Sequence, residues 1–208
     1  MHDFNQFVEL ADNLAIKYEK MAKTSSIVSF KVGGTSSIVA YPNSIEQFIQ
    51  ILKCIKSNQY KFCVVGNGTN VYFTDQNYNG IVICAKGLNK ISVTNNYLVA
   101  ECGASLNSCA VASYNNSLSG LEFAYGIPGT IGGGIFMNAS AFGKSISMVV
   151  YESIAFDLNS SKIVELSLKE HKFDDKKSVF MDGNYIILTS RLKLDFCDKE
   201  LIKAKMTQ

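Results

Sequence analysis

The stretch whose residue types best suit chemistry is Gly126-Ile-Pro-Gly-Thr-Ile-Gly-Gly-Gly134. Five of the 15 glycines and one of the two prolines fall within it. Glycine permits left-handed backbone conformations and lets the main chain approach a ligand closely. We therefore interpret this stretch as a cradle for a cofactor, and the elements around it as the framework that holds the cradle in place.

A second glycine cluster, Gly66-Asn-Gly-Thr-Asn70, follows a predicted strand at Phe62 to Val65. A Gly-x-Gly sequence after a strand is a weak signal, and a tight turn alone would explain it as well. The helix that a dinucleotide fingerprint requires next is missing, because Val71 to Phe73 has an extended pattern. The arrangement is therefore not the Rossmann one, although the backbone, Thr69 and Asn70 could still bind an anion.

Neither glycine stretch contains Lys or Arg, so a phosphate site built from them would depend on backbone N–H groups and helix N-termini. Two such loops facing each other suit a pyrophosphate, and hence a dinucleotide. Met137-Asn-Ala-Ser-Ala141 adds small residues against which a flat ring could lie, with Asn138 as a hydrogen-bonding amide. The alternative interpretation of these small residues is a tightly packed helix–helix contact.

Composition narrows the class of protein. With 208 residues, 47% of them hydrophobic and 18% charged, the chain has enough apolar material for a folded core. A net charge of +2 and the lack of a basic stripe argue against nucleic acid as a partner. Met1-His2-Asp3 lacks the basic start of a secretory signal, and no apolar run approaches the roughly 18 residues that span a bilayer. We expect no membrane association.

Cysteine and histidine usage narrows the chemistry further. The six cysteines include no Cys-x-x-Cys pair, so we expect reduced thiols in a cytoplasmic protein. Only His2 and His171 are present, which leaves almost no material for a histidine-based metal site or a Ser-His triad. We predict no metal site.

The elements of the first half follow from periodicity and turn signals. Phe4 to Lys23 has apolar residues at intervals of three and four, which predicts a packing helix. Ser26 to Tyr41, interrupted by Gly33-Gly34, predicts two short strands around a turn. Ser44 predicts a helix cap with Gln47 as its capping-box partner, and this helix joins its flanking strands into a parallel βαβ unit.

The second half has a strand-rich pattern. We predict a strand at Gly80 to Ala85, a hairpin of Ile91–Thr94 and Tyr97–Glu101 around Asn95-Asn96, a helix capped by Ser105 and ending at Tyr114, strands at Val149 to Phe156 and Ile163 to Leu166, a short helix from Ser167, and a last strand within Tyr185 to Leu194. The predicted class is α+β. We expect an N-terminal helix at 1–24, a first subdomain at 25–88, a second at 89–195 and a polar tail at 196–208.

Three segments together resemble the UDP-N-acetylenolpyruvoylglucosamine reductase family, also called UDP-N-acetylmuramate dehydrogenase. They are Gly66 to Asn70, the long run Gly120 to Ala139, and Ala141-Phe-Gly143. Ser29-Phe-Lys-Val-Gly-Gly34 is similar to the family's entry motif, and Tyr185 to Leu194 to the last strand of its flavin region. The resemblance covers roughly residues 25 to 195, in the family's order.

The resemblance implies an FAD-binding fold of the vanillyl-alcohol oxidase/p-cresol methylhydroxylase type, with FAD between two α+β subdomains. The family uses NADPH to reduce the flavin, which then delivers hydride to the enolpyruvyl double bond of a UDP-sugar in peptidoglycan synthesis for the cell wall. On the residues and the resemblance together we assign FAD to Gly66, Asn67, Gly68, Thr69, Asn70, Gly103, Ala104, Gly126, Ile127, Pro128, Gly129, Thr130, Gly132, Gly133, Asn138, Ala139 and Ala141.

The sequence departs from the family at its catalytic residues. The family's arginine lies in a Phe-Gly-Tyr-Arg-x-Ser motif, and the matching stretch here is Phe173-Asp-Asp-Lys-Lys-Ser178, which places Lys176 at the arginine position. Lysine keeps the charge but loses the planar fork. The alternative interpretation of Asp174 to Lys177 is a solvated loop. The family's proton-donating serine, in a Gly-Ser-x-Phe-x-Asn-Pro motif, and its catalytic glutamate have no match, so we expect a short member without the third, substrate-binding domain.

These observations leave several functions open. The first is an FAD-dependent oxidoreductase, impaired in the family reaction unless a partner chain supplies the missing groups. The second is a flavin-binding regulatory or scaffold paralogue without reductase activity. A piece of a longer chain is a third, because Asp198 to Gln208 resembles the start of the family's next helix. A small nucleotide-binding module of another class is a further alternative. In that case the similarity of the long run Gly120 to Ala139 to the reductase family would be a coincidence.

Overall fold

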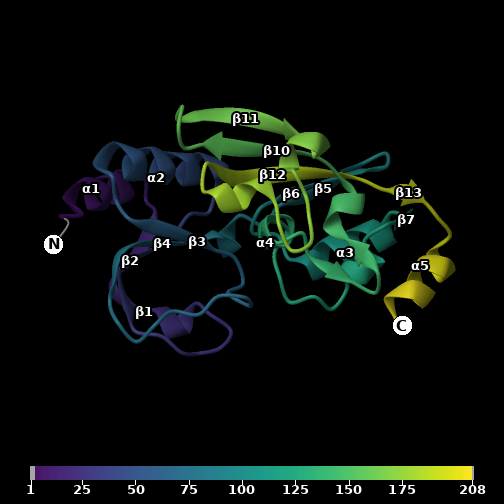
Figure 1. Ribbon diagram of the computed structural model, residues 1–208, viewed down its shortest axis with the longest axis horizontal. Coiled ribbons are helices and arrows are strands. Elements are labelled where there is room, and N and C mark those ends of the chain that lie inside the picture. The colour runs from purple at the N-terminus through teal and green to yellow at the C-terminus, as the bar shows by residue number, and fades with distance from the viewer. Residues whose placement is uncertain (1–2, 208) are drawn as a thin grey trace. The chain divides into compact units, whose positions relative to one another are not determined.

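The computed structural model describes residues 3–207 and divides the chain into two compact units, with the boundary between Leu88 and Asn89. The first unit holds the cluster at residues 66–70 and the second holds the stretch at residues 126–134 (Figure 1).

The first unit is a four-stranded sheet in the order β1-β2-β4-β3, with two helices. Strands β2 and β3 both run parallel to β4, which lies between them, and β1 pairs antiparallel with β2. The predicted parallel βαβ unit is thus confirmed, with β4 inserted between its two strands. The elements are α1 (Asn5–Asn13), β1 (Lys17–Lys23), β2 (Thr35–Tyr41), α2 (Ile45–Asn58), β3 (Phe62–Val65) and β4 (Tyr78–Cys84), with short 3-10 turns at Thr24–Ser26 and Ala85–Gly87.

The predicted helix at Phe4 to Lys23 is wrong in its second half. Helix α1 ends at Asn13, and Lys17–Lys23 forms strand β1, paired with β2 from Lys17↔Tyr41 to Lys23↔Thr35. Ala15 lies between them with a φ of +51°, which ends the helix. Pairing with the edge of β2 satisfies the backbone groups of this segment, and this outweighs the local helical periodicity. Residues 1–2 of the expected N-terminal segment lie outside the described residues.

The predicted pair of strands within Ser26 to Tyr41 is also wrong, since β2 alone forms there, at Thr35–Tyr41. Gly33, with a φ of +129°, and Gly34 lead into it. A Cβ on Gly34 would lie 2.3 Å from the backbone oxygen of Asp75. The glycine pair therefore serves a close approach between two backbone segments rather than a hairpin turn.

Helix α2 begins as predicted, with one change in its capping. Ser44 Oγ accepts a hydrogen bond from the N–H of Gln47 at 3.2 Å. Gln47 Oε1, however, accepts from the N–H of Asn43 at 2.9 Å, one residue before the expected partner. Gln47 also donates to the backbone oxygen of Leu14 at 3.0 Å, so this side chain ties the start of α2 to the end of α1.

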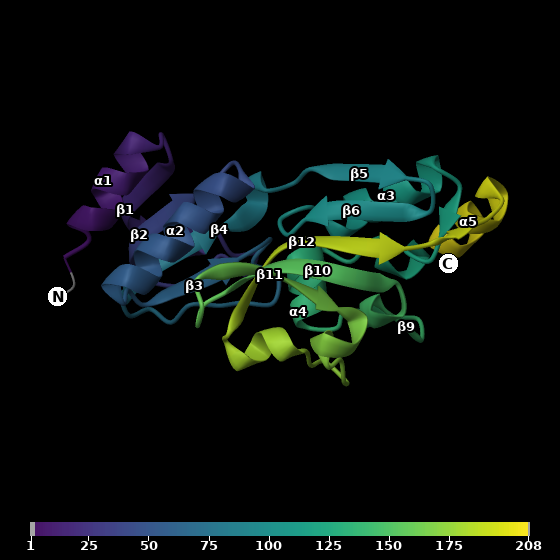
Figure 2. The same ribbon diagram turned by 90° about the horizontal axis from the view of Figure 1, so that it is seen from above.

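The second unit is built on a five-stranded antiparallel sheet in the order β11-β10-β12-β6-β5. Figure 2 shows β5, β6, β12 and β10 side by side, and α3 and α4 contact this sheet through β5, β6 and β12. The helices and strands of the second unit are β5 (Ile91–Thr94), β6 (Tyr97–Glu101), α3 (Leu106–Asn115), β7 (Leu118–Ser119), α4 (Ile131–Phe136), β8 (Ser140–Ala141), β9 (Lys144–Ser145), β10 (Val150–Asp157), β11 (Lys162–Ser167), β12 (Tyr185–Lys193), β13 (Asp195–Phe196) and α5 (Lys199–Met206).

Local predictions in this unit agree with the structure. The turn of the hairpin is Asn95-Asn96, and Asn95 has the left-handed φ of +54° that such turns require. Ser105 Oγ caps α3 by accepting from the N–H of Ser108 at 2.9 Å. Ser167 and Glu170 form a capping box at a short 3-10 helix, Leu168–His171. The segment expected as a tail contains α5, which Asp198 caps.

Candidate functional site

In the first unit, Gly68 and Ser29 link the loop Gly66 to Asn70 to the segment around Ile27 and Ser29. Gly68 has a φ of +64°, and a Cβ there would lie 2.5 Å from the backbone oxygen of Ile27. Its own carbonyl accepts from the N–H of Ser29 at 2.9 Å, and Ser29 Oγ donates to the oxygen of Asn67 at 3.3 Å. The loop is therefore fixed in shape, with Asn70 exposed to solvent.

In the second unit, the glycine-rich stretch folds back onto the end of β6 and the start of α3. The N–H of Ile131 donates to the carbonyl of Ala104 at 2.7 Å, and that of Gly132 donates to Cys102 at 2.9 Å. Gly103 and Ala104, the other residues assigned here, form the buried turn that supplies this support. Thr130 caps α4, since its Oγ1 accepts from the N–H of Gly133 at 3.3 Å.

The N–H groups at the start of α4 already have partners within the protein. The first four N–H groups of the helix, on residues 131–134, all donate within the protein. Two donors of the stretch have only long bonds of 3.3 Å: Gly133 to Thr130 Oγ1 and Gly126 to Asn107 Oδ1. Bonds of this length lie beyond the usual range of N–H···O distances, so these two N–H groups are more easily redirected toward a ligand than those of Ile131, Gly132 and Gly134.

The glycines of the stretch serve two different purposes. A Cβ on Gly132 would lie 2.9 Å from Cys102, and one on Gly129 or Gly134 would lie 3.2 Å from Leu106. Gly132 is therefore needed for packing within the protein, and Gly129 and Gly134 pack closely against Leu106. A Cβ on Gly126 would meet nothing within 4 Å, and one on Gly133 only Thr130 Oγ1 at 3.4 Å. These two lie where an external group has room to approach.

The amide of Asn138 is hydrogen-bonded at both ends within the protein. Its Nδ2 donates to the backbone oxygen of Asp174 at 2.9 Å, and its Oδ1 accepts from the N–H of Ser147 at 3.3 Å. The residue is 9% exposed and has a φ of +44°. Ala139 and Ala141 flank Ser140 at the start of a small hairpin, whose tip Phe142 is 81% exposed.

Lys176 lies in a tight turn closed by hydrogen bonds between Asp174 and Lys177, at 3.1 and 3.2 Å. Its φ of +51° is left-handed, which costs a non-glycine residue about 1–2 kcal/mol. Its Nζ donates to Ser140 Oγ. Ser178, just after the turn, is buried and donates to the carbonyl of Phe136 at 2.8 Å. The sequence did not indicate these contacts of Ser140 and Ser178, because a serine in a sequence does not show which group will be its hydrogen-bond partner.

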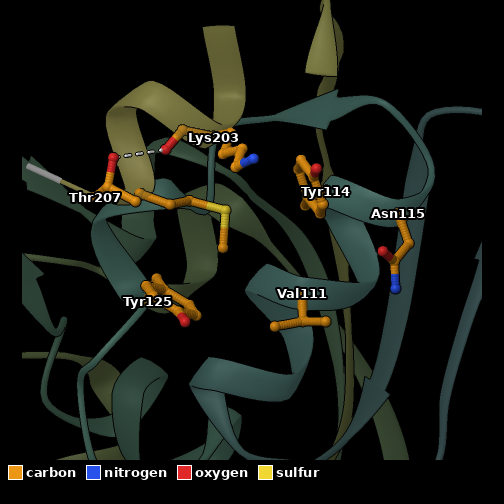
Figure 3. Close-up of a pocket in the computed structure, with 7 residues that line it drawn as sticks. Val111, Tyr114, Asn115, Tyr125, Lys203 and Thr207 are labelled. Atoms are coloured by element: carbon orange, nitrogen blue, oxygen red, sulfur yellow. Dashed lines mark hydrogen bonds between the residues drawn. The ribbon is translucent and has the colours of Figure 1, made fainter. Parts of the chain in front are cut away.

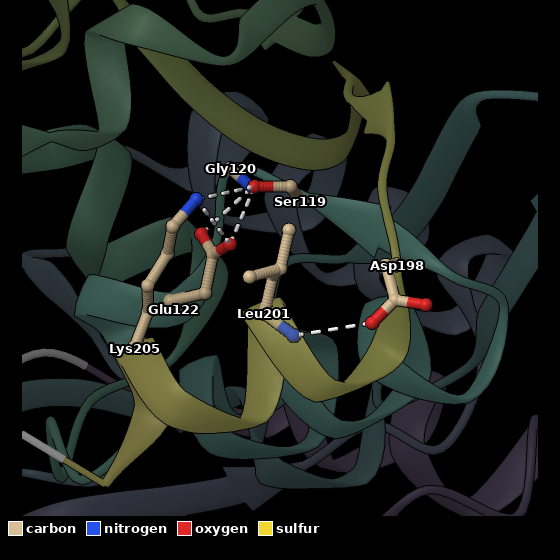
Figure 4. Close-up of polar contacts among 6 residues, drawn as sticks. All are labelled: Ser119, Gly120, Glu122, Asp198, Leu201 and Lys205. Carbon is tan, nitrogen blue, oxygen red and sulfur yellow. Dashed lines mark hydrogen bonds and ion pairs between the residues drawn. The ribbon is translucent and has the colours of Figure 1, made fainter.

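A carboxylate that the sequence analysis missed, Glu122, anchors the approach to the glycine stretch (Figure 4). It accepts from Ser119 Oγ at 2.5 Å and from the N–H of Gly120 at 2.8 Å, and Lys205 of α5 lies 3.8 Å away. Burial alone would raise the pKa of Glu122, but these hydrogen bonds and Lys205 together lower it. The signal available in the sequence was an acidic residue inside an otherwise apolar run, Leu121-Glu-Phe-Ala124.

His171 is buried in the core of the second unit and has a structural role. Its Nδ1 lies 2.7 Å from the carbonyl of Ser167, which can only accept, so Nδ1 carries the proton. Its Nε2 then accepts from Ser153 Oγ at 2.9 Å, and Ser153 pairs with Ser190 at 2.8 Å. Burial lowers the pKa of His171, which favours this neutral form.

Burial makes the thiols of Cys63, Cys102 and Cys109 less reactive, because it raises their pKa. All six cysteines are free, and burial raises the pKa of Cys102, beside Gly132, to about 12.

The residues that the structure describes include no cluster of three or more His, Cys, Asp or Glu side chains able to hold a metal. Over the same residues, no helix is both long and apolar enough to cross a membrane.

A shallow pocket of about 290 Å³ lies beside the glycine stretch without including it (Figure 3). Two tyrosine rings, from Tyr114 and Tyr125, line it together with Lys203 of α5. Tyr125 directly precedes Gly126, but none of the residues assigned to a cofactor lines the pocket. The pocket and the cradle are therefore separate features of this unit.

Comparison with known proteins gives these features a context. The profile of a family described as FAD binding domain matches residues 36–165. The UDP-N-acetylenolpyruvoylglucosamine reductases of Clostridium beijerinckii and Clostridium novyi are 38% and 35% identical, over 204 and 205 residues. Each alignment covers 98% of this chain and 66% of the relative, so the chain spans slightly less than two thirds of their length.

Solved structures agree on the fold. A UDP-N-acetylenolpyruvylglucosamine reductase from Thermus caldophilus superposes with a TM-score of 0.76 at 22% identity, covering 92% of this chain and 66% of that one. A glucooligosaccharide oxidase from Acremonium strictum superposes with a TM-score of 0.70 at 13% identity, covering 91% and 42%. The predicted fold class, α+β and FAD-binding of the vanillyl-alcohol oxidase/p-cresol methylhydroxylase type, is confirmed.

Proposed function

This chain belongs to the FAD binding domain family, and we propose that it holds FAD as the redox cofactor of an oxidoreductase of the UDP-N-acetylenolpyruvoylglucosamine reductase kind. The observation that carries the proposal is the similarity to such reductases over 98% of the chain. The family match, at residues 36–165, also includes both glycine stretches.

Two glycines of the second unit support the proposed binding of an anionic cofactor. Gly126 and Gly133 have open space in the direction of a side chain, and their N–H groups have only long bonds to the protein. A phosphate oxygen or a ring edge could approach there and accept those hydrogen bonds. The assigned neighbours Ile127, Pro128, Gly129 and Thr130 would hold the backbone of the cradle in shape, and Gly132 would keep it against Cys102.

The first unit would contribute the loop Gly66 to Asn70. Thr69 is half-buried and Asn70 exposed, and both carry neutral hydrogen-bonding side chains. Ser29 fixes the loop through Asn67 and Gly68. We propose that this loop binds the cofactor phosphates through neutral donors, so that affinity depends on shape more than on ionic strength.

Bound FAD supplies hydride chemistry, and we propose NADPH as the donor and an enolpyruvyl UDP-sugar as the acceptor. Reducing a carbon–carbon double bond requires a hydride on one carbon and a proton on the other. The family's proton-donor motif ends in Asn-Pro, and neither Pro42 nor Pro128 follows an asparagine. We therefore propose that these 208 residues carry out that reaction only with a proton donor from outside them.

The cytoplasm is the proposed location. All six cysteines are free thiols, which suits a reducing compartment. A cofactor such as NADPH is also available there. The proposed partners are FAD, a UDP-sugar and the polypeptide that supplies the proton donor.

The absorbance spectrum of the purified protein tests the proposal. We expect a bound flavin whose visible absorbance bleaches when NADPH is added without oxygen. A colourless protein that takes up no FAD on titration would contradict cofactor binding. A flavin that dithionite reduces but NADPH does not would contradict the oxidoreductase assignment while leaving FAD binding intact.

The second candidate function is a flavin-binding regulatory or scaffold protein. It is favoured by Lys176 at the position of the family's arginine, next to Asp174 and Asp175, whose carboxylates weaken a positive field. Its test is whether FAD changes the association of this chain with a full-length reductase, measured by sedimentation. FAD-dependent association without NADPH oxidation would favour this function over the first.

A further inference from the structure

The pocket beside the glycine stretch is built from three segments of the second unit. Tyr114 comes from α3, Lys203 and Met206 come from α5, and Tyr125 directly follows the 3-10 turn Glu122–Ala124. Helix α5 packs against both α3 and this turn, so the packing of the unit fixes the walls of the pocket. A volume of about 290 Å³ lies at the lower end of the range for ligand sites, which suits a single small ring with its substituents.

The walls of the pocket are aromatic and apolar. Figure 3 shows Tyr114 and Tyr125 on different sides of it, and Val111 and Met206 add further apolar atoms. Tyr125 is 43% exposed and Val111 is 37% exposed, so water covers apolar surface here when the pocket is empty. A flat ring that displaces this water would gain hydrophobic burial and could pack against the tyrosine rings in offset or edge-on geometry. The walls therefore favour a planar ligand.

The charge of the pocket is positive. Among the described residues that line it, Lys203 is the one charged side chain. Within residues 3–207, the ion pairs closer than 4.0 Å do not include Lys203. Lys199, one turn earlier on α5, has its Nζ 5.8 Å from the centre of the Tyr114 ring and adds positive charge beside the same wall. A positive charge at an apolar site whose lining has no carboxylate favours an anionic ligand.

Lys205, two positions further along α5, differs from Lys203 in both respects. Its Nζ lies 3.8 Å from Glu122 and 3.5 Å from Ser119 Oγ, and it does not line the pocket. Two residues at this spacing point about 200° apart around a helix, which separates the two lysines. One lysine of α5 is therefore matched by a carboxylate of the protein, and the lysine without such a match is the one at the pocket.

We propose that this pocket binds a small aromatic carboxylate, whose ring lies against Tyr114 and Tyr125 and whose carboxylate lies at Lys203. None of the residues assigned to FAD lines the pocket. The inference therefore goes beyond the proposed function and does not depend on FAD binding.

The test is a titration of the isotope-labelled protein with benzoate, followed by two-dimensional NMR. Benzoate should bind saturably with a Kd below about 10 mM, which follows from the usual binding energy of a ligand of this size. Benzamide keeps the ring and lacks the charge, and cyclohexanecarboxylate keeps the charge and lacks the flat ring. Each should bind at least about twofold more weakly than benzoate, because each loses one of the two proposed contacts.

Variants of the pocket identify the groups involved. Lys203→Met should weaken benzoate binding at least about fivefold, because the ion pair is lost. The matched control is Lys205→Met on the same helix, which should change the affinity by less than about twofold, since Lys205 does not line the pocket. Tyr125→Leu should weaken binding about two- to tenfold, and Tyr125→Phe, which keeps the ring, should preserve it. Tyr125 and both lysines are exposed, so these variants are expected to fold.

The outcomes separate this inference from the proposed function. The absence of saturable benzoate binding would overturn it, and so would equal losses in Lys203→Met and Lys205→Met, which would indicate non-specific attraction to a basic helix. Competition between benzoate and FAD would also overturn it, because the carboxylate would then occupy the cradle. A protein that binds benzoate at this pocket but takes up no FAD would contradict the proposed function and leave the inference intact.

Discussion

Asn138 Nδ2 donates a hydrogen bond of 2.9 Å to the backbone oxygen of Asp174, a residue 36 positions further along the chain. The other end of the same amide accepts from the N–H of Ser147. Asn138 also has a left-handed φ of +44°, which asparagine tolerates better than most residues. Asn138 therefore joins three backbone segments, and any role toward a cofactor comes after this structural one.

Replacing Asn138 by Gly should lower the free energy of unfolding by about 1–3 kcal/mol, because the Ser147 N–H and the Asp174 carbonyl lose a partner. Replacing it by Ala should cost about 1 kcal/mol more, since alanine is strained at positive φ. Urea denaturation followed by circular dichroism measures both. A Gly variant as stable as the unchanged protein would show that the amide does not hold these segments together.

Gly132 and Gly133 are adjacent, yet alanine should affect them in opposite ways. Gly132→Ala would place a Cβ 2.9 Å from Cys102 and should destabilise the fold by about 1–3 kcal/mol through overpacking. Gly133→Ala has room and should leave stability unchanged or raise it by up to about 1 kcal/mol, because alanine favours helix. FAD affinity, measured by fluorescence quenching, should fall in the Gly133 variant despite its intact fold. Normal affinity there would contradict the proposed approach of the cofactor to this face.

Glu122 should matter more to stability than its partner Lys205 (Figure 4). The Glu122 side chain is 11% exposed and accepts from Ser119 and Gly120, so Glu122→Gln should cost about 1–3 kcal/mol. The Lys205 side chain is 54% exposed, and Lys205→Met should cost less than about 1 kcal/mol. Chemical denaturation of the two variants gives the comparison. Equal losses would mean that the ion pair, rather than the hydrogen bonds, dominates.

The same carboxylate predicts a pH dependence. Because the pKa of Glu122 is lowered in the folded protein, its contribution is fully present above the ordinary value of 4.5 and is lost as the pH falls through the folded pKa. The unfolding free energy of the unchanged protein should therefore drop on acidification below that value. The Glu122→Gln variant should lose less over the same range, and parallel curves for the two proteins would rule out this assignment.

His171 predicts a second pH dependence, at a higher pH. Burial lowers its pKa below the ordinary value of 6.5, so between the two values the unfolded chain binds a proton that the folded protein does not. Stability should therefore rise with pH through this window and level off above 6.5. Denaturation across the window, with His171→Gln as a less stable but non-titrating control, measures the slope. A slope that persists in the control would assign it to another group.

Local features of this fold were predictable because they depend on residues close in sequence. The caps at Ser44 and Ser105 and the turn at Asn95-Asn96 each require only a few neighbouring residues. The predicted capping partner of Gln47 is wrong by one position, since the choice between Asn43 and Ser44 depends on how the chain enters the helix. The periodicity of Lys17–Lys23 predicts a helix, and only pairing with the edge of β2 makes this segment a strand.

The sequence by itself determined that the backbone at Gly66 to Asn70 and Gly126 to Gly134 is suited to close approach by a ligand. Its resemblance to a reductase family indicated that this ligand is FAD. Only the tertiary structure decided which glycines face the protein and which face open space, because Cys102 and Leu106 reach the stretch through packing. It also decided that the exposed Lys176 donates a hydrogen bond to Ser140, 36 residues away in the sequence. Contacts over such distances depend on how sheet and helix pack, and no local pattern of residue types encodes them.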